Sequence, residues 1–347
     1  MAQVCGSATS ALPARPIPHR IPRLRGRRTH TVGPAADKTV EDILGASHPP
    51  VPLADPMFKY VLVSLLLACS NSWSAVTFES AHVLVVDEAS GEVLLSKDVD
   101  SPAPIASLTK LMTAMVVLDA QQDPREELRI EPVDADQPRR SHGGVPVGAV
   151  ASRGSLLELA LLASDNRAAS ALARHYPGGL EAFDAAMQRK THALGLQSTL
   201  IDEPTGLAPT NVSSAQDMVK ILRAAASYPA IARITSQRSH AVLVNGRRRA
   251  VRNTNGLVGA PGWHVLLSKT GFTNDAGRCL GMRADVGGRT VTVVLLGAAK
   301  PSQRARDVML IGRWLAAKTP TTPVRAAAAR RASMLDVAAP MVEPTGP

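Results

Sequence analysis

The chain has 347 residues, of which 45% are hydrophobic and only 3% are aromatic, and its formal net charge is +10 at pH 7. This length allows one large domain or two ordinary ones, with a core built from aliphatic side chains. The charge is compatible with an anionic partner such as lipid headgroups or cell-wall polymer. Because much of the excess lies near the two ends and no basic-aromatic surface is evident, nucleic acid is not an expected partner.

The first 75 residues divide into two patterns. Residues 1–56 are rich in Pro, Arg, Ala and Ser without apolar periodicity, which predicts disorder. Residues 57–75 then read as a secretory signal peptide, with Lys59 ahead of a short apolar run and cleavage near Ala75. We therefore interpret Met57 as the true start and residues 1–56 as a wrongly assigned extension. The run also resembles a lipoprotein signal, which would leave Cys69 lipidated and tie the protein to a membrane.

Cysteine usage provides no disulfide framework. The chain contains Cys5, Cys69 and Cys279, and removal of the leader leaves Cys279 alone or nearly so.

The remaining chain reads as strands at both ends and helices between them. Predicted hairpins join residues 82–87 to 92–96 and 279–284 to 290–297, and predicted helices cover residues 107–120, 156–162, 166–174, 179–194, 215–226 and 303–317. This order favours an α+β fold, an antiparallel sheet made of strands from both ends with helices inserted. The Ala/Arg/Pro-rich tail, residues 319–347, is expected to be disordered.

Three short motifs occur once each, in a fixed order. Ser107 precedes Lys110 by three residues at the start of the helix over 107–120, so hydroxyl and amine share one helical face. Ser164-Asp165-Asn166 lies between two apolar helical runs, and Lys269-Thr270-Gly271 follows an apolar strand. Taken singly they can be an N-cap, a turn and a strand end. Together they are typical of penicillin-binding proteins and class A β-lactamases.

With these motifs, the chain resembles the serine D-Ala-D-Ala peptidases of the low-molecular-mass penicillin-binding protein family. Within it, the resemblance is closest to the D-alanyl-D-alanine endopeptidase (penicillin-binding protein 7) type. The segments over 105–115, 203–215 and 267–279, which contain or link the motifs, also match this type. The resemblance covers about residues 81–315. It implies a β-lactamase/transpeptidase-like fold over residues 76–318, in which an antiparallel sheet flanked by helices carries an inserted all-helical subdomain.

The first two motifs supply the predicted catalytic residues. Ser107 would attack a carbonyl to form an acyl-enzyme. Lys110 would be its base, provided that burial and a neighbouring cation, for which Lys269 is the candidate, suppress its charge. The resemblance implies that Ser164 relays a proton to the leaving amine and that Asn166 bonds the substrate amide.

The third motif supplies most of the predicted substrate-binding residues, which are Lys269, Thr270, Gly271, Phe272 and Arg304. The resemblance implies that Thr270 binds the terminal carboxylate and that Gly271 lets the substrate backbone lie close. It also implies that the backbone N–H groups of Ser107 and Phe272 form an oxyanion hole. Arg304 would lie near the carboxylate, although Arg306 is two residues away and a solvated helix start is the alternative interpretation.

Other enzyme classes fit less well. A class A β-lactamase needs a Glu-x-x-x-Asn element, but Leu207 stands four residues after Glu203 and Asn211 comes too late. A non-catalytic β-lactam-sensing module would not need all three motifs. The nine histidines form no His-Glu-x-x-His pair, so neither a metal nor another cofactor is expected.

The predicted function is therefore that of a periplasmic serine D-alanyl-D-alanine endopeptidase in cell-wall remodelling. Its expected substrates are cross-linked peptidoglycan stem peptides, with β-lactams as covalent inhibitors and a monomer as the active form. The alternative is a D-alanyl-D-alanine carboxypeptidase that trims pentapeptide stems. Relatives of that kind usually carry a β-rich C-terminal domain and an amphipathic anchor, whereas this chain ends 30 residues after Ala317.

Overall fold

A computed structural model describes residues 76–135 and 144–318. Its centre is a five-stranded antiparallel sheet in the order β2-β1-β11-β10-β9. The strands are β1 (His82–Asp87), β2 (Val93–Lys97), β9 (His264–Thr273), β10 (Gly277–Val286) and β11 (Arg289–Ala298). The predictions for residues 1–56, 57–75 and 319–347 lie outside the described residues.

The sheet confirms both predicted hairpins and the α+β class. β1 pairs with β2, and β10 pairs with β11 across Gly287 and Gly288, which have φ values of 58° and 76°. A two-residue turn with positive φ at both positions matches the twist of the flanking strands, and glycine adopts it without strain. β1 also pairs with β11, which brings the two ends of the domain together at the middle of the sheet.

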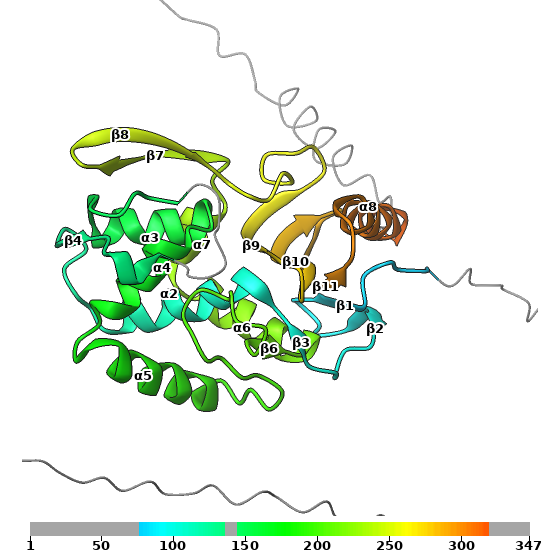
Figure 1. Ribbon diagram of the computed structural model, residues 1–347. Helices are drawn as coiled ribbons and strands as arrows, with labels where there is room; N and C mark the ends of the chain where they lie inside the picture. The colour runs from blue at the N-terminus through cyan, green and yellow to red at the C-terminus, as the bar shows by residue number, and fades with distance from the viewer. Residues whose placement is uncertain (1–75, 136–143, 319–347) are drawn as a thin grey trace, which may run out of the picture. The chain divides into compact units, whose positions relative to one another are not determined.

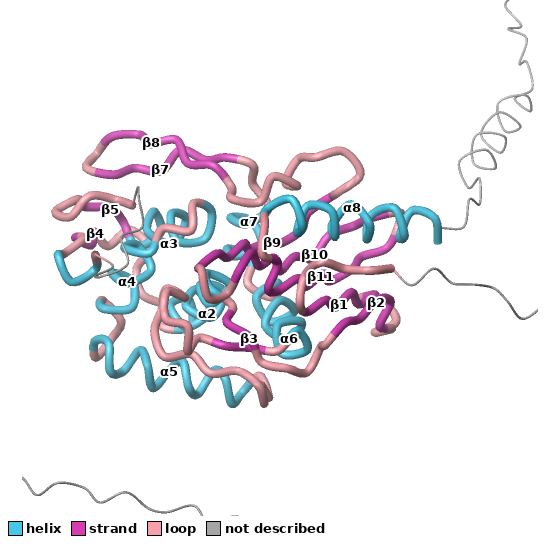
Figure 2. Tube along the Cα trace, turned by 45° about the vertical axis from the view of Figure 1, so that its right-hand side comes forward, coloured by secondary structure: helices cyan, strands magenta, loops and turns pink. Residues whose placement is uncertain are grey.

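Side chains that alternate along the central strands build a hydrophobic core on each face of the sheet. Val83 and Val85 of β1 pack with the C-terminal helix α8 (Pro301–Lys318), whereas Leu84 and Val86 belong to the core shared with the inserted helices. Successive residues of a strand point to opposite faces, so a strand covered on both sides reads as a continuous apolar run. Figures 1 and 2 show α8 on one side of the sheet and α6 on the other.

The inserted segment is mainly helical, as predicted. Its helices are α2 (Lys110–Asp119), α3 (Arg153–Leu162), α4 (Asn166–Arg174), α5 (Gly179–Ala193), α6 (Ala215–Ala226) and α7 (Pro229–Thr235). Ser152, Asp165 and Ser214 cap α3, α4 and α6 by accepting a backbone N–H three residues ahead.

The predicted helix over 107–120 differs at its start. Residues Ala106–Thr109 form a 3₁₀ helix, η2, and α2 begins only at Lys110. Side chains three residues apart are eclipsed in a 3₁₀ helix, so Ser107 and Lys110 still share a face. Ser107 is not the N-cap, because Ile105 holds that position of η2.

Short two-stranded ribbons interrupt the helical insert. Within the described residues these are β3 (Ala103–Pro104) with β6 (Val212–Ser213), β4 (Glu127–Arg129) with β5 (Val150–Ser152), and β7 (Ser239–Val244) with β8 (Arg247–Arg252). The ribbon of β7 and β8 projects at the top of Figure 1. Its turn is Asn245-Gly246, a strong hairpin signal, but three successive arginines in β8 hide the strand pattern.

Asp307 ties α8 to the segment before β1. Its fully buried carboxylate accepts the backbone N–H groups of Glu79 at 2.9 Å and Ser80 at 2.7 Å. Asp307→Ala leaves both donors without this acceptor, and we expect the free energy of unfolding to fall by about 2–4 kcal/mol. Urea denaturation measures the loss. Met309→Ala, an exposed position of the same helix, should change stability by less than about 0.5 kcal/mol, and an equal effect of both variants would contradict this interpretation.

Candidate active site

The three motifs meet at a cleft of ≈770 Å³ between the helical insert and the edge strand β9. Seven of the nine predicted site residues line it: Ser107, Ser164, Asn166, Thr270, Gly271, Phe272 and Arg304. The other two, Lys110 and Lys269, are buried behind the cleft wall. Segments more than 150 residues apart in the sequence therefore contribute to one site.

Lys110 is the point at which three segments converge. Its ammonium nitrogen lies 2.9 Å from Ser107 Oγ, 2.6 Å from Asn166 Oδ1 and 2.6 Å from the carbonyl oxygen of Thr205. Its side chain is only 1% exposed. The burial and the contact with Ser107 are those that a general base for this hydroxyl requires.

Lys269 makes a second lysine–serine pair. Its ammonium lies 2.8 Å from Ser164 Oγ and 3.0 Å from the carbonyl oxygen of Thr270. Burial, and then the positive charge of Lys110, hold the pKa of Lys269 well below its usual range. The two buried amines therefore disfavour a state in which both carry a positive charge.

Ser164 is held in a strained backbone conformation. Its φ is 61°, in the left-handed region that non-glycine residues seldom adopt. The middle residue of the motif fixes this turn, because the Asp165 carboxylate accepts the N–H of Ala168 at 3.1 Å and that of Val145 at 2.8 Å. The three residues of this motif therefore have different structural positions. Ser164 and Asn166 face the cleft, and Asp165 caps α4.

Glu203 organises the loop that supports Lys110, a role that the sequence did not reveal. Its carboxylate accepts the backbone N–H groups of Thr205 at 2.7 Å and Gly206 at 2.6 Å, and the Asn211 side chain at 3.1 Å. These bonds place the Thr205 carbonyl against Lys110. Glu203 is not among the residues that line the cleft, which differs from the water-activating glutamate that a class A β-lactamase needs.

Two glycines allow the backbone to close around the turn that carries Ser107. A Cβ on Gly206 would lie 2.0 Å from the carbonyl oxygen of Ala106, and one on Gly271 would lie 2.8 Å from that of Ile105. Gly206 also has a φ of 83°. We predicted Gly271 from the needs of the substrate, but packing against the turn that carries Ser107 is a second reason for glycine at this position.

The far end of the cleft is rich in arginine. Arg304 lines it and donates to the carbonyl oxygen of Cys279 at 3.1 Å, whereas Arg306 pairs with Glu79 at 2.8 Å and is not among the lining residues. Burial, and then the charge of Arg278, lower the pKa of Arg304. Arg278 also lines the cleft and lies over the ring of Phe272, with its guanidinium carbon 3.6 Å from the ring centroid.

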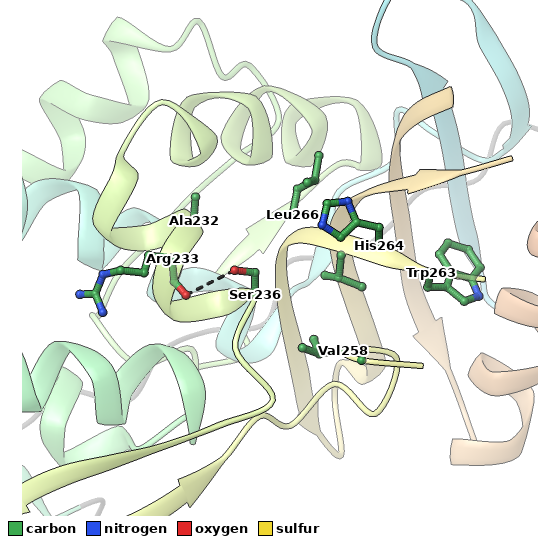
Figure 3. Close-up of a pocket in the computed structure, with 9 residues that line it drawn as sticks. Ala232, Arg233, Ser236, Val258, Trp263, His264 and Leu266 are labelled. Atoms are coloured by element: carbon green, nitrogen blue, oxygen red, sulfur yellow. Dashed lines mark hydrogen bonds between the residues drawn. The ribbon is translucent and has the colours of Figure 1, made fainter. Parts of the chain in front are cut away.

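A separate hollow of ≈410 Å³ lies between α7 and the first residues of β9, and it shares no lining residue with the cleft. Figure 3 shows Trp263 and His264 on one side of it and Arg233 and Ser236 on the other. Trp263 packs against the core under α8, and His264 pairs with Asp285 at 2.9 Å. Trp263 thus contributes to packing, and His264 forms an exposed ion pair outside the cleft.

Two lysine–serine pairs meet at the cleft, Lys110 with Ser107 and Lys269 with Ser164, in an α+β fold built on an antiparallel sheet. This arrangement is typical of active-site serine enzymes. A family profile described as D-alanyl-D-alanine carboxypeptidase matches residues 69–300. The chain belongs to this family of serine peptidases.

Known proteins agree with this membership. The chain is 42% identical to a D-alanyl-D-alanine endopeptidase of Pseudomonas aeruginosa, over 68% of this chain and 77% of the relative. It is 36% identical to a D-alanyl-D-alanine endopeptidase of Escherichia coli, over 75% and 89%, and 34% identical to a D-alanyl-D-alanine carboxypeptidase of Mycobacterium tuberculosis, over 61% and 73%. The crystal structure of the Streptomyces K15 DD-transpeptidase matches 70% of this chain and 98% of its own, with a TM-score of 0.64 and 26% identity.

Gly271→Ala should slow acylation of Ser107. The added Cβ meets the backbone of Ile105 and must push β9 away from the turn that carries the nucleophile. We expect the rate of labelling by a fluorescent penicillin to fall by about tenfold or more, since small displacements of reacting groups have effects of this size. The matched control is Gly256→Ala, where a Cβ meets nothing within 4 Å. Unchanged labelling of Gly271→Ala would contradict the proposed packing constraint.

Lys269 should make stability depend on pH. The unfolded chain keeps this lysine protonated up to about its usual pKa of 10.5, whereas the folded site releases the proton at lower pH. Between these two values the unfolded state binds more protons, so the wild type should gain up to ~1.4 kcal/mol of stability per pH unit. Lys269→Met lacks this dependence. Urea denaturation of both proteins at pH 7, 8 and 9 tests the prediction. A difference in unfolding free energy between the two proteins that stays constant with pH would contradict it.

Proposed function

We propose that this protein is a serine D-alanyl-D-alanine endopeptidase that hydrolyses the peptide cross-links of peptidoglycan. The observation that carries the proposal is the contact of Lys110, buried behind the cleft wall, with both Ser107 and Asn166, which line the cleft. The endopeptidase relatives support the choice of substrate, since the two most similar relatives described above carry that activity in their names.

In the proposed reaction, Ser107 Oγ attacks the carbonyl carbon of the D-alanine whose amide bond forms the cross-link, and its proton passes to neutral Lys110. The tetrahedral intermediate then collapses with cleavage of the C–N bond, and the leaving amine takes the proton that Lys110 received, by way of Ser164, which Lys269 contacts at 2.8 Å. Lys110 is then neutral again. Water hydrolyses the resulting ester with Lys110 again as the base, which restores Ser107. Asn166 bonds both Lys110 and, in the proposal, the amide of the substrate.

The edge strand supplies the proposed substrate-binding groups. An extended peptide can add to the free edge of β9 beside Thr270 and Gly271. Thr270 Oγ1 lies 2.6 Å from Thr254 Oγ1 at the cleft wall, which orients the hydroxyl proposed to bind the carboxylate together with Arg304. The backbone N–H groups of Ser107 and Phe272 are the proposed oxyanion hole.

The proposed place of action is the periplasm, in keeping with cell-wall peptides as substrates. The predicted signal peptide over 57–75 and lipidation at Cys69 stay predictions, as does the monomeric state. Among residues 76–135 and 144–318, the structure contains no helix with the length and apolarity needed to cross a membrane.

Incubation of the purified protein with cross-linked dimeric muropeptides should yield monomers. Ser107→Ala should abolish both this cleavage and covalent labelling by a fluorescent penicillin, because no hydroxyl remains to form the ester. Thr273→Ser, at another cleft-lining position, serves as a control that keeps a hydroxyl and should retain labelling.

Assays with three substrates distinguish the endopeptidase from a carboxypeptidase and from a β-lactamase. Persistence of dimers while pentapeptide monomers lose D-alanine would exclude the endopeptidase and establish the carboxypeptidase. Rapid turnover of a chromogenic β-lactam would establish a lactamase instead. Labelling of Ser107→Ala would contradict the assignment of the nucleophile.

A further inference from the structure

We propose that the ribbon of β7 and β8 is a second binding surface, which holds a peptidoglycan strand by the carboxylates of stem peptides that are not in the cleft. The inference rests on the proposed function for the identity of this polymer. The positive charge comes from four arginines of β8, and we call the hairpin with these side chains the basic ribbon. They are Arg247, Arg248, Arg249 and Arg252.

The basic ribbon lies in a part of the chain without acidic residues. Between Asp217 and Asp275 the sequence contains no Asp or Glu. None of the four arginines forms an ion pair with another described residue. Glu158 of α3, which packs against β7, pairs instead with His240 at 3.5 Å and with Arg233 at 3.6 Å. The charge of the ribbon is therefore available to an anionic partner.

The strand register gives the ribbon one inner and one outer face, because directly opposite residues of two paired strands share a face. Val242, Val244 and Val251 belong to the hydrophobic core on the inner face. The outer face carries three cross-strand pairs, which are Leu243 with Arg248, Ala241 with Ala250, and Ser239 with Arg252.

Two of the arginines on the outer face are suited to an extended ligand. Arg248 and Arg252 are exposed and four residues apart, which corresponds to about 13 Å along a strand. Only the small side chains of Ala241 and Ala250 lie between them, so no bulky group separates such a ligand from the two guanidinium groups. Guanidinium groups bind carboxylates by parallel N–H donors.

Hydrogen bonds hold the ribbon at both ends. At the tip, Asn245 donates its backbone N–H to the carbonyl oxygen of Val150 in β5 at 2.8 Å, and its Oδ1 accepts the N–H of Val150 at 2.7 Å. At the base, the Asn253 side chain donates to the carbonyl oxygen of Thr235 at 2.9 Å. In both views the ribbon lies over α3 (Figures 1 and 2). A surface fixed in this way loses little conformational freedom when it binds.

The base of the ribbon leads into the cleft. Arg252 precedes Thr254 by two residues, and Thr254 lines the cleft and contacts Thr270 at 2.6 Å. A polymer that occupies the cleft with one stem peptide therefore lies beside Arg252. The carboxylates of its neighbouring stems then come within reach of the ribbon, and this continuity favours the polymeric substrate as the partner.

Anionic lipid is the other partner that a basic hairpin can bind. Segments that lie in a lipid interface usually combine basic side chains with aromatic ones. Residues 238–252 contain no Phe, Tyr or Trp. Within the ribbon, Leu243 is the one large apolar side chain that is exposed. The composition of the ribbon thus favours the wall polymer over a membrane surface.

The test measures co-sedimentation of the protein with insoluble peptidoglycan, in a Ser107→Ala background so that the polymer is not cut. We expect Arg248→Gln with Arg252→Gln to raise the Kd by about tenfold and to weaken its dependence on salt, because two exposed charge contacts are lost. The matched control is Arg189→Gln with Arg313→Gln. It removes two exposed arginines of α5 and α8 that form no ion pair with described residues, and it should leave the Kd unchanged. Thermal unfolding verifies that both double variants are folded.

Two further ligands identify the anion without any change to the ribbon. Peptidoglycan whose stem carboxylates are converted to amides should bind about tenfold more weakly than the unmodified polymer. Vesicles that contain phosphatidylglycerol should bind more weakly than peptidoglycan. Preference for the vesicles, or unchanged binding of the amidated polymer, would overturn the inference.

The variants also separate this inference from the proposed function. Equal affinity of the ribbon variant and the control variant for peptidoglycan would overturn the inference, while cleavage of dimeric muropeptides by the protein with Ser107 intact would leave the proposed function standing. Weaker binding of the ribbon variant, together with dimers that stay intact, would support the basic ribbon and overturn the endopeptidase.

Discussion

The site depends on the contacts of one buried amine, that of Lys110. It joins the 3₁₀ turn of Ser107, the first residue of α4 and the loop at Thr205 through three hydrogen bonds of 2.9 Å or less. A lysine inside a protein is costly unless its donors are satisfied, so any displacement of these segments raises the energy of the amine. The geometry proposed for catalysis is thus also the geometry that accommodates the buried lysine.

Backbone groups around Lys110 fix the positions of the segments that contact it. The Thr205 carbonyl reaches Lys110 because the Glu203 carboxylate binds the N–H groups that follow it. Gly206 and Gly271 allow two separate segments to touch the turn at Ala106 from different sides. A side chain at either position would separate elements that have to lie within hydrogen-bonding distance. Positioning residues of this kind explain why the sequence that links the motifs matters as much as the motifs.

The sequence predicted the hairpins of the sheet, the main helices and the residues of the three motifs because each has a local signature. Apolar periodicity marks α4 and α6 to within a residue, and Lys269 follows an apolar strand. The contributions of Glu203, Gly206 and Arg278 were not predictable, because they arise between segments that meet only in the fold. The hairpin of β7 and β8 was missed because arginines replace the apolar residues of its second strand. The roles of the motif residues remain predictions, although their placement around one cleft agrees with them.

The pairing of β1 with β11 makes formation of the cleft depend on the end of the chain. Val83 lies opposite Leu295, so the middle of the sheet requires contacts between residues more than 200 positions apart. Pairing over such a distance is intrinsically slow, because closing the long intervening loop costs entropy before the contacts form. The edge strand that carries Lys269 joins the sheet through β10 and β11, and the turn of Ser107 packs on it. A nascent chain that does not yet include β11 therefore lacks the complete cleft, and we expect hydrolytic activity only once this last strand is present.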